Sequence, residues 1–201
     1  MLTFASSRAI GRICHDRRPM PSPIGHALAG MAVAWGTDAL SRQPGQHPST
    51  RPTIGSLTLL FAGLAVAPDL DLLYMPVHRT ATHSVAAAAL VTIVAALVTR
   101  WVTGRVNWPI AVGCGVAWAS HVLLDALAAD PSRPYGIQAF WPVSDRWFRS
   151  PWVIFPHTER RSPLSSHAMW INLRAALTEM IIMGTVAGAA WAIRRRGRQG
   201  G

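Results

Sequence analysis

The stretch "HRTATHSVAAAALVTIVAALVT" (residues 78–99) places two histidines and an arginine directly before a long apolar run, which extends from His83 to Thr103. The apolar residues form a continuous block instead of a stripe that repeats every 3.6 residues, so the pattern indicates a helix in a membrane. Ionisable groups at the edge of such a helix are costly unless they are paired or functional. His78, Arg79 and His83 are therefore candidates for a functional site.

Four other apolar blocks accompany this one along the chain. A bilayer span needs about 20 residues, with about 17 as the lower limit. The blocks at 84–98, 109–129 and 171–193 are the strong candidates, 24–40 is borderline, and 54–67 is long enough only if it continues through Asp69 to Tyr74 or tilts. We expect an all-α, multi-span membrane protein of about five apolar helices. A soluble helical bundle with Ala-rich, wholly buried helices is the alternative.

The composition agrees with a membrane protein and argues against a nucleic-acid partner. Of the 201 residues, 50% are hydrophobic and 14% are charged, which an ordinary soluble domain does not show. The formal charge is +10, yet the arginines are scattered over loops and chain ends and do not line one helical face. Arginines 194, 195, 196 and 198 directly follow the last apolar block, as expected of a membrane-flanking anchor.

Residues 1–19 carry four arginines but no uninterrupted apolar core, so they do not form a secretory signal. We expect them to be a disordered basic leader or a mis-called start, because "MPSPIGHALAG" from Met20 is a more natural beginning. Residues 20–201 then form a single integral membrane domain. Cys14 lies in the polar leader and Cys114 within an apolar block, so no bridge between them is expected.

The long connection 130–167 contains "FWPVSDRWFRSPWVIFP" (140–156), in which aromatic residues alternate with arginine and proline. This composition suits the headgroup layer of a bilayer better than water or the hydrocarbon core. We interpret the segment as interfacial; a packed soluble cap is the alternative.

Metal-compatible residues lie at the ends of four of the blocks. If all five blocks cross the bilayer, an even number of crossings separates the start of the first, the end of the second, the start of the third and the end of the fourth. The side chains at these points are His26, Asp69, Asp71, His78, His83, His121 and Asp125. We therefore expect them to form one His/Asp site at a single membrane face.

The spacing in "SHVLLD" is the most constrained of these motifs. His121 and Asp125 are four residues apart on a predicted helix, so their Cβ atoms lie about 5–6 Å apart. They can chelate one cation or simply form a hydrogen-bonded pair. Asp69 and Asp71, in "APDLDLL", repel one another unless a cation or an arginine neutralises them, or unless water solvates them in a loop.

Imidazole and carboxylate together favour a divalent metal, most of all Zn²⁺, with Mn²⁺ or Fe²⁺ as alternatives. Because a catalytic zinc needs only three protein ligands, seven candidates predict two or more ions, or one ion with outer partners. Arg79 would instead bind an anion, and its planar group suits phosphate. Glu179, inside the last block, could pair with Arg174 or join the site, and His157 and His167 are weaker candidates.

The motifs "MPSPIGHALAG", "PDLDLL", "HRTATHS" and "SHVLLDAL", followed by "FWPVSDRWF", resemble the YdjM-like family, described as membrane-bound metal-dependent hydrolases. The resemblance covers about residues 20–150. It implies a multi-span bacterial inner-membrane protein whose His/Asp site comprises the seven residues above. It also implies a distant similarity to zinc-dependent phospholipase C and the P1-type nucleases, which cleave phosphoesters. Thr80 departs from the family pattern, which has glycine after the arginine.

Residues and resemblance together predict a metal-dependent hydrolase that cleaves a phosphoester of a lipid or lipid-linked substrate. A metal-activated water would attack phosphorus, Asp69 or Asp71 would act as general base, and Arg79 would stabilise negative charge. A metal-binding transporter or sensor is the alternative, and its site should lie at mid-depth with access from both sides. A structural membrane protein with buried polar pairs is a third possibility.

Overall fold

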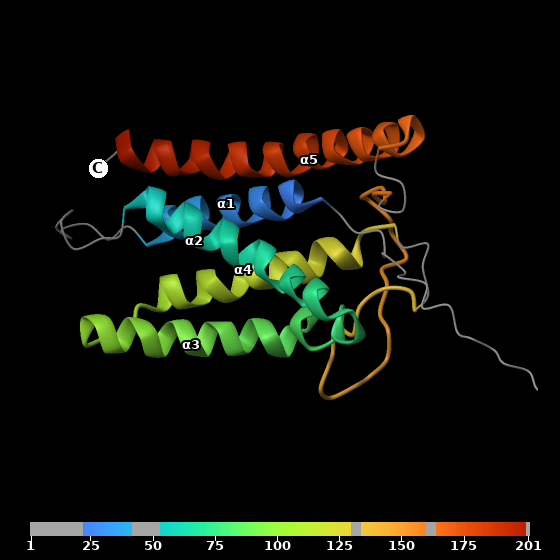
Figure 1. Cartoon of the computed structure of the whole chain (residues 1–201). Helices are drawn as coiled ribbons and strands as arrows, with labels where there is room; N and C mark the ends of the chain where they lie inside the picture. Colours follow the sequence, from blue (N-terminus) through green and yellow to red (C-terminus); the bar gives the residue numbers. More distant parts are fainter. Residues whose placement is uncertain (1–21, 42–52, 130–133, 160–163, 200–201) are drawn as a thin grey trace, which may run out of the picture.

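The computed structural model describes residues 22–41, 53–129, 134–159 and 164–199, and within these ranges the regular structure is helical apart from two isolated β-bridges. The expected all-α fold is confirmed (Figure 1). Five long helices run in the order α1 (Pro23–Leu40), α2 (Ile54–Val66), α3 (Val85–Thr103), α4 (Trp108–Ala126) and α5 (Ser166–Gln199). Two 3-10 segments, η2 (Ala67–Val77) and η3 (Ala81–His83), connect α2 to α3. The predicted leader, 1–19, lies outside the described residues.

Helices α2, α3 and α4 begin where the sequence supplies a capping side chain. The side chains of Thr53, Ser84 and Asn107 each accept a hydrogen bond from a backbone N–H in the first turn of α2, α3 and α4. Gly104 ends α3 with a φ of 74°, in the left-handed region that glycine adopts without strain. Local sequence therefore fixes both ends of α3, including the end that carries the site.

Helix α1 lies at the centre of the bundle and packs against α2, α4 and α5, while α3 packs against the outer side of α4. In Figure 1, α5 and α3 form the two outer edges of the bundle. Close approach of α1 and α2 requires a residue without a side chain, because a Cβ on Gly30 would lie 2.3 Å from the carbonyl oxygen of Phe61. The order of the helices thus depends on small residues as much as on large apolar ones.

Within the part of the chain that the structure describes, four helical stretches are long and apolar enough to cross a membrane: Ile54–Tyr74, Val85–Thr103, Trp108–Ala126 and Ser166–Gly197. The second predicted block does continue through η2 to Tyr74, as its length requires. The borderline first block, now α1, is not among the four. The physical reason is its central position, since neighbouring helices cover its sides and its composition need not match lipid.

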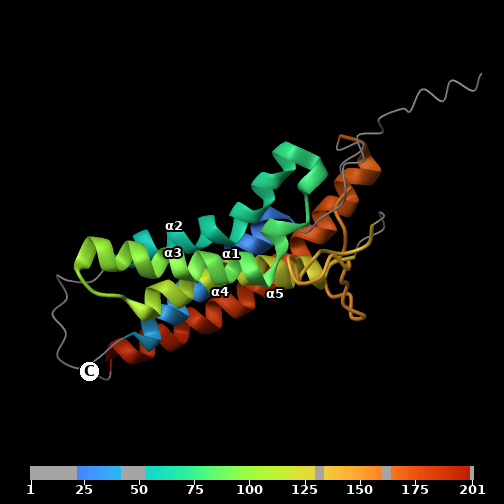
Figure 2. The ribbon, with the colours of Figure 1, turned by 90° about the horizontal axis from the view of Figure 1, so that it is seen from below.

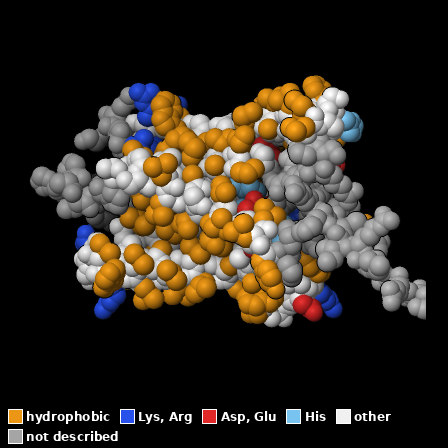
Figure 3. Space-filling view, viewed as in Figure 1, with side chains coloured by type: hydrophobic (Ala, Val, Ile, Leu, Met, Phe, Trp, Pro, Cys, Tyr) orange, Lys and Arg blue, Asp and Glu red, His pale blue; other side chains and the backbone are white. Residues whose placement is uncertain are grey.

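The outer surface of the bundle is apolar between two ends that carry charge. Figure 3 shows hydrophobic side chains over much of one face, with arginines near the ends. Helix α3 is the most exposed of the candidate spans, because only 11% of its apolar window is buried inside the protein. Such an exterior suits lipid and would be a large exposed apolar patch in water.

One arginine of the predicted anchor has a partner inside the bundle. Arg194 Nε donates to Asp38 Oδ2 at 2.7 Å, which joins the end of α5 to the end of α1. Arg195 and Arg196 are exposed, as expected of membrane-flanking residues. The ion pair between Arg194 and Asp38 lies at the end of α1 opposite His26.

Candidate metal centre

The structure brings all seven predicted site residues into one network at one end of the bundle. His26 lies in the first turn of α1, and His121 and Asp125 lie in the last turns of α4. The remaining four come from η2, η3 and the turn between them: Asp69, Asp71, His78 and His83. This arrangement agrees with the common face that counting membrane crossings predicts.

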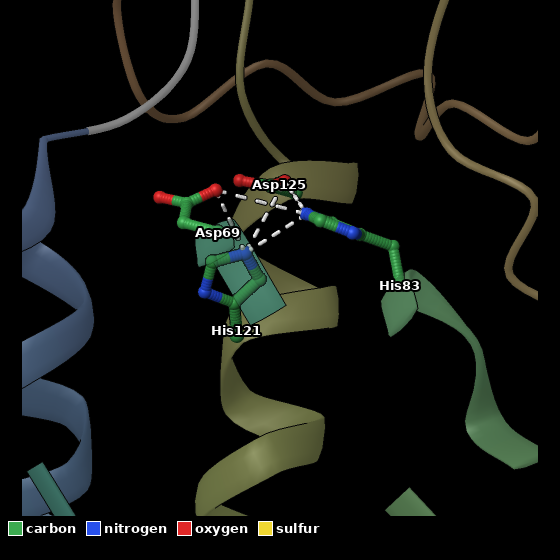
Figure 4. Close-up of side chains that lie close together, drawn as sticks. All are labelled: Asp69, His83, His121 and Asp125. Carbon is green, nitrogen blue, oxygen red and sulfur yellow. Dashed lines mark hydrogen bonds and ion pairs between the residues drawn. The ribbon is translucent and has the colours of Figure 1, made fainter. Parts of the chain in front are cut away.

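Four of these side chains converge closely (Figure 4). One ligand atom from each of Asp69, His83, His121 and Asp125 lies within 4.8 Å of all the others. Asp125 Oδ2 is 3.2 Å from His83 Nε2 and 3.6 Å from His121 Nε2. Asp69 Oδ1 is 3.8 Å and 3.5 Å from the same two nitrogens. We call these four residues the central group.

His26 borders the central group from α1. Its Nε2 lies 3.5 Å from Asp125 Oδ1, and its ring stacks on that of His121 with 3.9 Å between the ring centroids. Neither nitrogen of His26 has a hydrogen-bond partner among the described residues, although the side chain is fully buried. His26 is therefore available as a further ligand.

The two imidazoles of the central group are oriented through their other nitrogen. His121 Nδ1 donates to the carbonyl oxygen of Ala65 at 2.8 Å. His83 Nδ1 hydrogen-bonds to the hydroxyl oxygen of Thr82 at 3.0 Å and lies 3.1 Å from Asp71 Oδ2. Because the Ala65 carbonyl and the Asp71 carboxylate are acceptors, and the Thr82 hydroxyl already donates to Asp71, the neutral form of each ring carries its proton on Nδ1 and leaves Nε2 to accept. The two Nε2 atoms face one another at 3.1 Å. A cation or a shared proton is needed between two such lone pairs.

The buried oxygens of the central group also lack donors. Asp69 Oδ1 and both carboxylate oxygens of Asp125 have no hydrogen-bond partner among the described residues. Buried polar atoms are nearly always partnered, and a buried carboxylate without a counter-charge is costly. A divalent cation would satisfy these oxygens and both Nε2 atoms together. The donor set therefore fits a metal of the Zn²⁺, Mn²⁺ or Fe²⁺ type.

Asp71 differs from the other two aspartates because both of its oxygens already accept hydrogen bonds. Oδ2 accepts from the backbone N–H of Arg79 at 3.2 Å and from the hydroxyl of Thr82, and it forms an ion pair with His83 Nδ1 at 3.1 Å. Oδ1 accepts from His78 Nδ1 at 2.6 Å. Asp71, His78 and His83 form a second metal-compatible group, which shares His83 with the central group.

The acidic surroundings of His83 raise its affinity for a proton. Burial favours its neutral form, but the carboxylates of Asp125, Asp69 and Asp71 outweigh burial and raise the pKa of His83 well above its ordinary value. A cation that binds at Nε2 would therefore compete with a proton.

Arg79 and Thr80 form the turn that aims His83. Arg79 is buried and has a φ of 64°, so an arginine occupies the left-handed conformation here. Its carbonyl oxygen accepts from the backbone N–H of Gln138 at 2.9 Å. Thr80, at the position where the motif resemblance predicts glycine, has a φ of −106° and a ψ of −112°.

Glu179 lies outside the metal-compatible groups. Its carboxylate is fully buried and accepts from the backbone N–H groups of Ser22, at 2.8 Å, and Gly25, at 3.2 Å, and from the Ser22 hydroxyl. It therefore caps the first turn of α1, the turn that carries His26. Arg174, the partner that the sequence suggested for Glu179, is exposed. Sequence gives little sign of this role, because its partners lie more than 150 positions away.

The remaining predicted candidates stay apart from these groups. His157 is partly exposed and His167 is exposed, and neither belongs to a metal-compatible group within the described residues.

The connection after α4 packs across the end that carries the site. Backbone hydrogen bonds join Val85 N–H to Ala139 O at 2.9 Å and Ser150 N–H to Ala126 O at 3.0 Å. Its aromatic side chains are mostly exposed, although Phe155 is buried against the bundle. The segment predicted to be interfacial is therefore fixed to the bundle while it presents apolar side chains outward.

Long apolar helices, with a group of imidazoles and carboxylates that could hold a metal ion at one end, define a helical membrane protein with a candidate metal centre. A family model described as "YdjM inner membrane protein" matches residues 20–197. The chain belongs to this family, and the match extends beyond the quoted motifs through most of α5. No curated protein and no solved structure matches the chain.

Proposed function

We propose that this protein is a multi-pass, metal-dependent hydrolase of the bacterial inner membrane, which cleaves a phosphoester of a lipid or lipid-linked substrate. One observation carries the proposal. The Nε2 atoms of His83 and His121 converge on the carboxylates of Asp69 and Asp125, while hydrogen bonds fix both Nδ1 atoms. Imidazoles restrained in this way are typical of metal ligands.

The geometry supports a distinct role for each group. His83, His121, Asp69 and Asp125 would hold the ion, with His26 beside them. A divalent cation there would lower the pKa of a water molecule towards about 7 and offset negative charge at phosphorus. Zn²⁺ is our first choice, with Mn²⁺ or Fe²⁺ as alternatives and a second ion at the group that shares His83.

Other side chains would complete the reaction. Asp69 is the least enclosed member of the central group and is best placed to accept the proton of the attacking water. Asp71, with both oxygens engaged, would orient His78 and His83 instead of acting as the base. The guanidinium of Arg79, which follows His78 in the same turn, would bind the phosphate oxygens. This division of labour resembles the phosphoester chemistry of zinc-dependent phospholipase C and the P1-type nucleases, which the motifs imply.

The position of the site supports an enzyme over a metal transporter. Within the described residues, both metal-compatible groups contain His83 and lie at one end of the bundle. A transport pathway needs metal-binding groups at mid-depth with access from both sides. The apolar, outward-facing connection at 140–156 would place the site in the headgroup layer, where a lipid phosphate is within reach.

Hydrolysis by the purified protein tests the proposal. The protein in nanodiscs would be stripped of metal, reloaded with Zn²⁺ or Mn²⁺, and supplied with a panel of phospholipids and polyprenyl phosphates. We expect metal-dependent release of phosphate or headgroup, and a loss of at least 100-fold in Asp125→Asn, on the order of the loss when an essential catalytic group is removed. Stoichiometric metal without hydrolysis of any substrate would favour the transporter or sensor.

A further inference from the structure

The central group is almost entirely buried. The side chains of His83, His121 and Asp125 are fully buried, whereas that of Asp69 is 10% exposed. Asp69 lies on η2, the segment that follows α2. The direction from which a ligand can reach the group is therefore the side covered by η2.

The outward side chains of η2 are apolar. Leu70 is 67% exposed, Leu73 is 89% exposed and Tyr74 is 64% exposed, and they alternate with the site aspartates along the same turns. Figure 2 shows the segment after α2 projecting from the side of the bundle. Because η2 also completes the apolar stretch Ile54–Tyr74, Asp69 lies within an apolar candidate span.

The surroundings of this opening are those of a membrane-facing surface. In Figure 3, acidic and histidine atoms come into view in the middle of the face, with hydrophobic side chains on several sides. Leu59 and Leu60, on the preceding helix α2, are also exposed. A site that admits water-soluble substrates would be expected to have a polar rim, whereas this one is bordered by leucines.

From these features we propose that the site opens sideways into the bilayer past η2, and that its ligand is a phosphate-bearing amphiphile that enters from the leaflet with its alkyl chain against Leu70 and Leu73. The proposal rests on the metal centre of the proposed function for the phosphate contact, but the position of η2 in lipid can be measured without it. The headgroup would reach Asp69 without leaving the membrane surface.

The first experiment locates η2. A spin label would be attached at Leu73→Cys in a background without the native cysteines, in nanodiscs, and its collision rates with oxygen and with a water-soluble nickel chelate would be compared. Arg105→Cys, in the exposed turn between α3 and α4, is the aqueous reference. We expect oxygen to dominate at position 73 and the nickel chelate to dominate at position 105. Equal nickel accessibility at the two positions would overturn the proposal, whether or not the protein binds metal.

The second experiment tests the ligand. The protein loaded with Co²⁺ would be titrated with methylphosphonate and with dodecylphosphonate, and the visible spectrum of the metal would report binding. We expect the double variant Leu70→Asn/Leu73→Asn to weaken dodecylphosphonate binding about tenfold, in line with the loss of two apolar contacts, and to leave methylphosphonate binding unchanged. Leu40→Asn is the matched control, because Leu40 is also 89% exposed but lies at the opposite end of α1.

The outcomes separate this proposal from the proposed function. Failure of Co²⁺ to bind, or of both phosphonates to alter its spectrum, would contradict the proposed function and leave the spin-label result to decide the position of η2. An equal effect of the double variant on both phosphonates, or no effect on either, would overturn lateral entry even if the metal centre is correct.

Discussion

Replacement of Asp71 by asparagine distinguishes an orienting carboxylate from a metal ligand. Asp71 accepts hydrogen bonds on both oxygens, whereas an asparagine offers one carbonyl oxygen and an NH₂ group. If the amide oxygen faces Thr82 and His83, the NH₂ group faces His78 Nδ1, which must change its tautomer to accept. The bond that orients His83 survives but is no longer assisted by charge.

The size of the effect follows from that bond. Hydrogen bonds to charged groups contribute about 1.5–3 kcal/mol and neutral ones about 0.5–1.5 kcal/mol, so the support for His83 falls by about 1–2 kcal/mol. We therefore expect Asp71→Asn to weaken metal binding about 10–100-fold, the range found for outer-shell partners, without a change in stoichiometry.

Competition with a calibrated chelator would give the affinity, and elemental analysis at saturating metal would give the stoichiometry. Asp125→Asn is the matched control, because its carboxylate has no hydrogen-bond partner among the described residues and faces three imidazoles. We expect this control to lose metal outright. A lower stoichiometry in Asp71→Asn, with an affinity loss as large as that of the control, would refute the orienting role and make Asp71 a ligand.

Two further variants test how the bundle positions the site. Glu179→Ala removes the acceptor of Ser22 and of the first turn of α1, and should lower the free energy of unfolding by about 3 kcal/mol, with a smaller loss in Glu179→Gln. Equal unfolding midpoints for the wild type and the alanine variant would contradict the cap. Gly30→Ala places a Cβ 2.3 Å from the Phe61 carbonyl oxygen and should cost about 1–3 kcal/mol. Gly36→Ala, on the same helix with open space around it, should be neutral or slightly stabilising in the same thermal melt, and an equal cost at both glycines would exclude close packing as the cause.

Much of the fold was predictable because lipid imposes a simple rule on sequence. A span must be apolar throughout, so α3 and α4 could be predicted from block length alone, and the parity of crossings predicted that His26 and His121 meet. The caps at Ser84 and Asn107 are local, and a short sequence window contains both partners of each bond. These features need no knowledge of the tertiary structure.

The parts that could not be predicted depend on contacts between distant segments. The hydrogen bond from His121 to the carbonyl oxygen of Ala65 is a backbone contact between α4 and α2, and no side-chain pattern encodes it. From sequence, Glu179 is a candidate metal ligand. Its partners in the structure are backbone N–H groups, and no sequence motif marks them because every residue except proline supplies one. From sequence, Asp69 and Asp71 are equivalent candidates, and only their different hydrogen bonds in the structure distinguish them.

The metal content of the purified protein tests the central claim most directly. After exposure to Zn²⁺ and removal of excess metal, elemental analysis of the wild type should find at least one ion per chain. The same analysis of the double variant His121→Ala/Asp125→Ala should find almost no metal, and circular dichroism should show that its helices are intact. Wild-type protein that emerges without metal, or a double variant that retains a full complement, would contradict a shared cation at the converging ends of these helices.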